Sequence, residues 1–189
     1  MSLKEHFTDI YENNRWGGGS GGGSEPNFTL PYRQFLSIFL KEKNIKSVVD
    51  YGCGDWQSSR LINFDGIEYL GIDIVDSIIK FNIENYSKEN IKFKILDNFE
   101  DFFDYTADLL ILKDCIQHWK NSDIDYFLPK VIDNFKYILI NNSSRQLYDN
   151  QDTPVMNRPL SAKFEPLKKY MPKILFTYND KEISIITKN

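Results

Sequence analysis

The chain has 189 residues and a formal net charge of −4 at pH 7, from 23 Lys and Arg against 27 Asp and Glu. This length suits one domain with a full hydrophobic core, and the acidic balance does not favour a protein that binds nucleic acid through a basic surface. No apolar run approaches the roughly 18 residues of a membrane-spanning helix, and no signal-peptide pattern opens the sequence. We therefore expect a cytoplasmic protein without a membrane segment, present as a monomer or homodimer.

The N-terminal part has its own composition. Residues 4–14 predict a short amphipathic helix, because apolar side chains recur at i, i+3 and i+4. A run of glycine and serine follows at 17–24, directly after Trp16. By composition the run is a flexible linker; alternatively, it is a lid whose backbone N–H groups and Trp16 close over a ligand. We divide the chain into residues 1–28, a helix with a lid or linker, and a main domain at 29–189.

From residue 29 onward, helical and extended patterns alternate. A helix begins at Thr29 or Leu30, and another is capped by Asp76 and has Ile79, Ile83 and Tyr86 on its inner face. A further helix begins at Ser122. We expect a first crossover helix at 57–63, an irregular crossover at 98–105, strands at 48–50, 69–74, 91–97, 108–114 and 135–141, and an antiparallel hairpin from 174–178 and 182–187. The pattern predicts an α/β fold with a seven-stranded, mostly parallel sheet, helices on both faces and a C-terminal antiparallel hairpin.

One stretch resembles a ligand-binding turn. Val48-Val49-Asp50-Tyr51-Gly52-Cys53-Gly54-Asp55-Trp56 reads as a buried strand, a tight glycine turn and the start of a helix. Glycine allows sharp backbone turns and close approach of N–H groups to a ligand. The dinucleotide fingerprint G-x-G-x-x-G fails here, because its third glycine is replaced by Gln57.

Acidic residues follow the later strands. Asp73 comes 19 residues after Gly54 (73 − 54), near the spacing at which an acid binds ribose hydroxyls in nucleotide-binding βαβ units. Asp97 and Asp114 end the next two apolar runs. The carboxyl ends of parallel strands meet at one edge of a sheet, so these acids predict a ligand site there. Each acid taken alone could instead be a turn former or helix cap.

The D-x-G-C-G run at 50–54 and the acids that follow it resemble the class I S-adenosylmethionine (SAM) dependent methyltransferases, which have a Rossmann-like fold. The resemblance implies SAM as cofactor and S-adenosylhomocysteine (SAH) as product. It implies that Gly52 and Gly54 admit the methionine half of SAM, Asp50 orients the turn, Asp73 binds the ribose and Asp97 the adenine. The other expected cofactor contacts are Cys53, Trp56, Ile74, Asn98, Lys113 and Asp114. The family pattern usually has a further glycine where this chain has Trp56.

The residues that would bind the methyl acceptor are harder to identify from the sequence. His118 lies four residues after Asp114, and these two are the candidate catalytic residues. Histidine is the usual base near neutral pH, although His118 could equally be a capping or packing residue. Arg145 and Arg158 would suit an anionic acceptor, or they are solvated loop arginines. Trp16 and Trp119 complete the candidate substrate contacts.

Together these features predict a SAM-dependent methyltransferase acting on an O or N atom of a small molecule or glycan, without a metal ion. The alternatives are a nucleic-acid or cap methyltransferase and a non-catalytic SAM-binding module.

Overall fold

The computed structural model describes residues 2–145, 152 and 158–188, and the chain divides into two compact units, residues 1–98 and 99–189. Seven strands form a sheet in the order β3-β2-β1-β4-β5-β7-β6. This order confirms the predicted mostly parallel sheet with an antiparallel C-terminal pair. In the described part of the chain, no helix is both long and apolar enough to cross a membrane.

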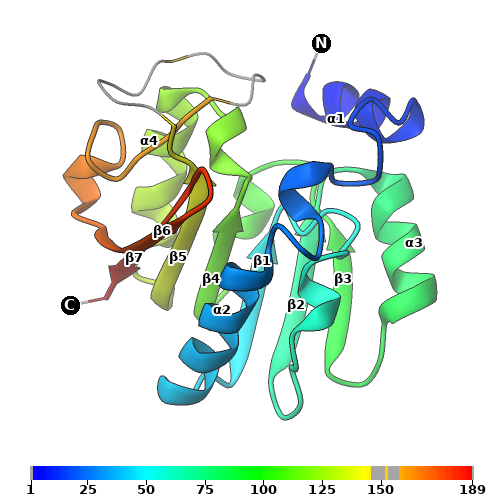
Figure 1. The fold of residues 1–189 in the computed structure, drawn as a ribbon, viewed down its shortest axis with the longest axis horizontal. Helices are drawn as coiled ribbons and strands as arrows, with labels where there is room; N and C mark the ends of the chain where they lie inside the picture. Colours follow the sequence, from blue (N-terminus) through cyan, green and yellow to red (C-terminus); the bar gives the residue numbers. More distant parts are fainter. Residues whose placement is uncertain (1, 146–151, 153–157, 189) are drawn as a thin grey trace. The chain divides into compact units, whose positions relative to one another are not determined.

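The first unit holds three parallel strands and three α-helices (Figure 1). Its elements are α1 (Leu3–Glu12), α2 (Leu30–Glu42), β1 (Ser47–Tyr51), β2 (Glu68–Asp73), α3 (Asp76–Tyr86) and β3 (Ile91–Ile95), with short 3-10 turns η1 (Gly22–Ser24) and η2 (Ser59–Leu61). Proline in the first turn of α2 suits a helix start, and its buried face carries Tyr32, Leu36, Phe39 and Leu40. The predicted helices at 4–14 and from residue 29 are therefore confirmed.

The described residues of the second unit form four strands. Its elements are β4 (Ala107–Lys113), α4 (Asn121–Val131), β5 (Phe135–Ser143), β6 (Lys173–Tyr178) and β7 (Lys181–Thr187), with 3-10 turns η3 (Glu100–Phe102), η4 (Ile116–His118) and η5 (Lys168–Tyr170). β4 and β5 are parallel, whereas β7 runs antiparallel to both β5 and β6. The predicted hairpin is confirmed, and Asn179 has the positive φ of 47° that its tight turn requires.

Two details predicted for α3 are wrong. Ile83 is 46% exposed, because the inner stripe runs through Ile79 and Asn82 and Ile83 falls beyond its edge. Asp76 does not cap the helix: Val75 occupies the N-cap position, and the Asp76 carboxylate instead pairs with Lys4 at 2.8 Å.

The predicted crossover helix at 57–63 is also wrong, since only the short turn η2 forms there. Trp56 adopts a left-handed conformation with φ of 59°, which redirects the chain where a helix would otherwise begin. Its ring is buried in an aromatic cluster made up of Phe64, Tyr69, Tyr86 and Phe93. Packing of this ring therefore outweighs the local preference of the segment for a helix.

Replacing Trp56 with glycine separates these two effects. Glycine removes a backbone strain of roughly 1 kcal/mol, whereas loss of a buried tryptophan ring costs about 3–5 kcal/mol. We expect Trp56→Gly to lower the free energy of unfolding by about 3 kcal/mol in urea denaturation. Asn44→Gly is the control, because Asn44 is exposed and has a similar φ of 50°. A more stable Trp56→Gly protein would mean that strain dominates at this position.

Candidate functional site

The glycine turn after β1 is fastened to β2. Gly52 and Gly54 have φ of 80° and 54°, in the region that favours glycine. The backbone N–H groups of Gly52 and Cys53 both donate to the carbonyl of Ile72, at 2.8 and 3.0 Å. The N–H of Gly54 donates to the Asp73 carboxylate at 3.0 Å. The structure therefore brings together the glycines and the acid that the sequence predicted to be neighbours.

Asp73 is a carboxylate held by the backbone. Its Oδ1 accepts from the Val75 N–H at 3.0 Å, and its Oδ2 accepts from Gly54. Burial raises the pKa of Asp73 above its ordinary value, although these N–H groups and that of Ile74 oppose the rise. Each carboxylate oxygen has a second lone pair, so Asp73 can accept further hydrogen bonds from ligand hydroxyl groups.

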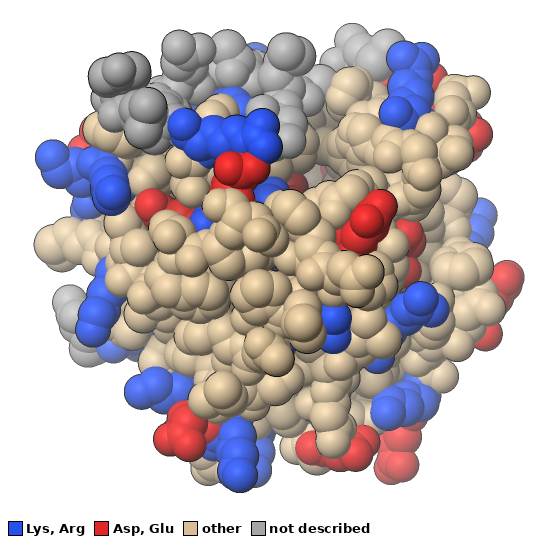
Figure 2. Space-filling view, viewed as in Figure 1, with Lys and Arg blue, Asp and Glu red and all other residues tan. Residues whose placement is uncertain are grey.

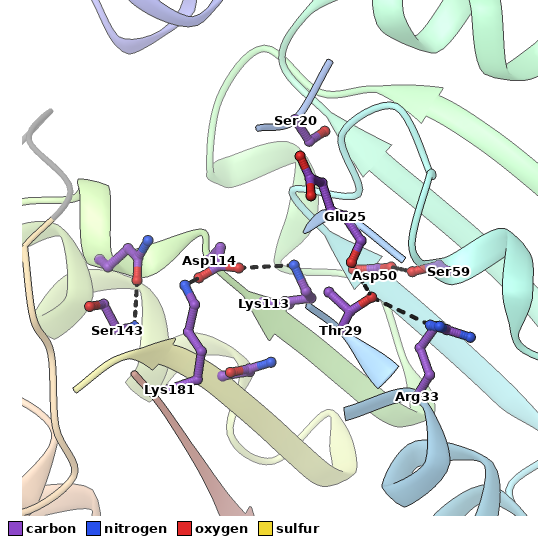
Figure 3. A network of polar contacts seen from close by, with 12 residues as sticks. Ser20, Glu25, Thr29, Arg33, Asp50, Ser59, Lys113, Asp114, Ser143 and Lys181 are labelled. Carbon is purple, nitrogen blue, oxygen red and sulfur yellow. Dashed lines mark hydrogen bonds and ion pairs between the residues drawn. The ribbon is translucent and has the colours of Figure 1, made fainter. Parts of the chain in front are cut away.

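Asp50 is buried, whereas Cys53 is half-buried. The buried Asp50 carboxylate accepts from the Ser59 hydroxyl at 3.2 Å (Figure 3). It also accepts from the Tyr69 hydroxyl at 2.7 Å. Asp50 therefore ties the segment after the glycine turn to β2. Burial raises the pKa of the Cys53 thiol, which favours its neutral form.

Asn82 supports the glycine turn from α3, and the sequence analysis missed it. Its side chain is fully buried and donates from Nδ2 to the carbonyl of Gly54 at 2.7 Å. A polar residue on the inner, apolar face of a predicted helix was the available signal, since a buried amide requires hydrogen-bond partners.

The helix α1 contacts the end of β3. The Lys4 ammonium lies 2.6 Å from Asp97 Oδ1 and 2.8 Å from Asp76 Oδ1. Trp16 packs edge-on against Phe7 and Tyr11 of α1, with ring centroids 5.9 and 6.1 Å apart.

Three other residues of this unit were expected to contact the cofactor. Ile74 follows β2, Asn98 is exposed after β3, and the Trp56 ring lies in the aromatic cluster.

In the second unit, one carboxylate lies between two lysines. Asp114 follows β4 with a positive φ of 54°, and both Lys113 (2.9 Å) and Lys181 bond to its carboxylate (Figure 3). Burial raises the pKa of Asp114, but attraction by the two ammonium groups outweighs burial and leaves the pKa below its ordinary value. Lys181 begins β7 and is itself buried, so the cluster joins the ends of two strands far apart in sequence.

The short turn that carries His118 is held by Arg158. The Arg158 guanidinium donates to the carbonyl of Gln117 at 3.3 Å, to the carbonyl of Trp119 at 2.7 Å and to Asn121 Oδ1 at 2.9 Å. It is only 2% exposed, and burial lowers the pKa of Arg158. Arg158 thus fixes the backbone on both sides of His118.

Of the other two residues of the second unit that were expected to contact an acceptor, one is buried and one is exposed. Trp119 is buried against Phe99 and Phe127, whereas Arg145 is exposed and pairs with Asp180. In the connection at 143–166, residues 146–151 and 153–157 lie outside the described part of the chain. On the face drawn in Figure 2, the described Lys and Arg residues are interspersed with Asp and Glu and form no continuous basic patch.

The lysine pair around Asp114 predicts a pH-dependent stability. Asp114→Asn leaves buried ammonium groups without their carboxylate, so we expect a loss of about 3 kcal/mol of unfolding free energy at pH 7. The stabilisation by Asp114 is complete above the unfolded-state pKa of about 3.9, and it is lost as the pH falls through the lower folded-state value.

Urea denaturation of the wild type and Asp114→Asn at pH 7 and pH 3 tests this expectation. The difference between the two proteins should be smaller at pH 3. Asp180→Asn is the control, since its exposed pair with Arg145 should contribute less. An equal difference at both pH values would contradict an electrostatic role for Asp114.

No protein-family model matches the chain, and no curated protein matches its sequence. Solved structures do match. Magnesium protoporphyrin IX methyltransferase from Synechocystis PCC 6803 with bound SAH has a TM-score of 0.67 and 12% identity over 99% of this chain and 98% of that chain. Human N-acetylserotonin methyltransferase in complex with SAM has a TM-score of 0.59 and 16% identity, covering 100% and 60%. The 16S rRNA methylase ArmA has a TM-score of 0.58 and 18% identity, covering 100% and 92%. The chain therefore has the fold of the class I methyltransferases.

Proposed function

We propose that this chain is a SAM-dependent methyltransferase that transfers a methyl group to an O or N atom of a small molecule or glycan. The observation that carries the proposal is the Gly52–Gly54 turn bonded to the Asp73 carboxylate, at the carboxyl ends of β1 and β2. Ligands of open α/β sheets bind at this edge. Solved structures of the same fold that contain SAM or SAH support it.

The residues present fit the cofactor. Beyond the backbone N–H groups of Gly54, Val75 and Ile74, the Asp73 carboxylate keeps acceptor capacity for a ribose hydroxyl group. Asp97 is exposed after β3, and although its Oδ1 pairs with Lys4, its other carboxylate oxygen can accept from the adenine amino group. We propose that Gly52 and Gly54, through their positive φ, place the turn at the methionine half, with Gly54 itself packed against Ser20. We further propose Cys53, Ile74, Asn98, Lys113 and Asp114 as cofactor contacts, and Trp56 and Asp50 as residues that shape the turn.

When bound, SAM supplies an electrophilic methyl group on a positively charged sulfur atom. A hydroxyl or ammonium acceptor must lose a proton before or as it attacks. We propose His118 as the base, because histidine exchanges protons near neutral pH. The hydrogen bonds from Arg158 to Gln117 and Trp119 would keep this residue in one position during proton transfer.

The nature of the acceptor can be tested directly. Mass spectrometry of ligands that co-purify with the protein, followed by a methylation screen of metabolites and glycans, addresses the proposed class. An RNA or DNA acceptor is the second candidate, since an rRNA methylase shares the fold. The net charge of −4 makes that candidate weaker, and a salt-dependent gel shift with methylation of RNA would favour it.

Asp73→Ala tests the cofactor assignment. The variant removes acceptors for the ribose hydroxyl groups, so we expect SAH affinity to fall at least tenfold, about 1.4 kcal/mol or more. Isothermal titration calorimetry measures the dissociation constant. The exposed Asp104 provides a matched control, and Asp104→Ala should bind SAH as the wild type does. Unchanged affinity in Asp73→Ala would refute the role of Asp73.

His118→Asn tests the base once an acceptor is found. We expect the rate of methyl transfer to fall by about 10²- to 10⁴-fold, while SAH affinity stays within about twofold of the wild-type value. Single-turnover transfer and calorimetry give the two quantities separately. A variant that keeps its transfer rate would show that His118 serves only in packing.

A further inference from the structure

The Gly/Ser run is folded against the glycine turn of the first unit. The backbone N–H of Ser20 donates to Asp55 Oδ2 at 3.1 Å, and its hydroxyl donates to Asp55 Oδ1 at 2.7 Å. The N–H of Asp55 donates back to Ser20 Oγ at 3.1 Å. We call these three bonds the Ser20–Asp55 latch. Residues 35 positions apart thus bond to each other reciprocally, which a passive tether would not do.

Tyr11 of α1 also bonds to Ser20, next to the latch. The Tyr11 hydroxyl lies 2.8 Å from Ser20 Oγ. Because the single Ser20 hydroxyl proton points to Asp55, Tyr11 must be the donor to Ser20. Burial and the negative charge of Asp73 raise the pKa of the Tyr11 hydroxyl, which favours its protonated, donor form.

Two glycines are needed for this close approach. A Cβ on Gly19 would lie 1.8 Å from Asp55 Oδ2, and one on Gly54 would lie 2.3 Å from Ser20 Oγ. Both residues also have positive φ, 53° and 54°. By contrast, a Cβ on Gly22 would meet no atom within 4 Å, and Gly22 has no positive φ. The glycines of the run are therefore not equivalent.

A second attachment holds the other end of α1. Lys4 bonds to Asp97 after β3, while Ser20 bonds to Asp55 after β1. The N-terminal segment, residues 3–24, therefore reaches from the end of β1 to the end of β3, with Asp73 at the end of β2 between them. Figure 1 shows α1 at this end of the strands of its unit.

We propose that the N-terminal segment is part of the cofactor site, and that the Ser20–Asp55 latch with Tyr11 holds it closed over the adenosine half of SAM. This inference rests on the proposed function and adds residues to that site. Molecules in which the segment is closed over the strand ends retain the cofactor. Weakening the latch lowers the fraction of molecules in the closed state, and the apparent affinity for SAM and SAH falls in proportion.

Calorimetric titration of the full chain with SAH tests the inference, using the wild type and three variants. Gly19→Ala should bind SAH about tenfold more weakly, because its Cβ displaces the Asp55 carboxylate. Ser20→Ala should bind about fivefold more weakly, since it removes two of the bonds to Asp55 and the partner of Tyr11. Gly22→Ala is the matched control and should stay within about twofold of the wild type. Ser20→Ala adds no volume, so it serves if Gly19→Ala does not fold.

Hydrogen exchange gives a second measurement. The Ser20 amide should exchange more slowly when SAH is added to the wild type, and this added protection should shrink in Ser20→Ala. If the wild type binds SAH but Gly19→Ala, Ser20→Ala and Gly22→Ala bind equally well, or the latch variants bind more tightly, the inference is overturned and the proposed function stands. If the wild type binds no SAH, both are overturned.

Discussion

The hydrogen bond from the Gly54 N–H to the Asp73 carboxylate is the interaction on which the position of the glycine turn depends. A partly buried carboxylate is stable only with donors around it, and the left-handed turn at Gly52–Gly54 supplies one. The same bond fixes the end of β1 to the end of β2, so the turn cannot move independently of the sheet. Asn82 then bonds to the carbonyl of Gly54 and Ser20 covers its Cα. Gly54 is thereby in contact with three segments that are distant in sequence.

The regular elements were predictable because their signals are local. Apolar runs that end in an acid gave the parallel strands, and helical spacing of apolar residues gave α2. The segment after Trp56 was not predictable in the same way. A large L-residue rarely adopts positive φ, and its sequence carries no sign that an aromatic cluster will hold it there. Tertiary packing of one ring replaced a helix with a short turn.

In the candidate site, too, contacts with a local sequence signal were predictable and contacts set by tertiary packing were not. The sequence predicted that Asp73 would lie beside the glycines, because the spacing of a βαβ unit is nearly constant. It did not predict that Lys181 would bond to Asp114, 67 residues away, or that Arg158 would bond to the carbonyls around His118. A buried lysine on a strand and an arginine in a long connection have no periodic signal. Such partners follow from strand order, as when β7 is placed beside β5.

The Gly/Ser run shows why composition and conformation must be separated. Ordering the backbone of one residue costs about 1–2 kcal/mol, and the cost is greatest for glycine. A hydrogen bond returns only about 1 kcal/mol in net terms. The bonds of Ser20 to Asp55 and Tyr11 therefore offset the ordering of only a few glycines. A segment whose folding is balanced so closely can be shifted between open and closed states by a ligand that binds beneath it, since a ligand needs to supply only the small remaining difference. The glycines that make the run resemble a linker also make it suitable as a movable cover, because they allow close contact when closed and a high entropy when open.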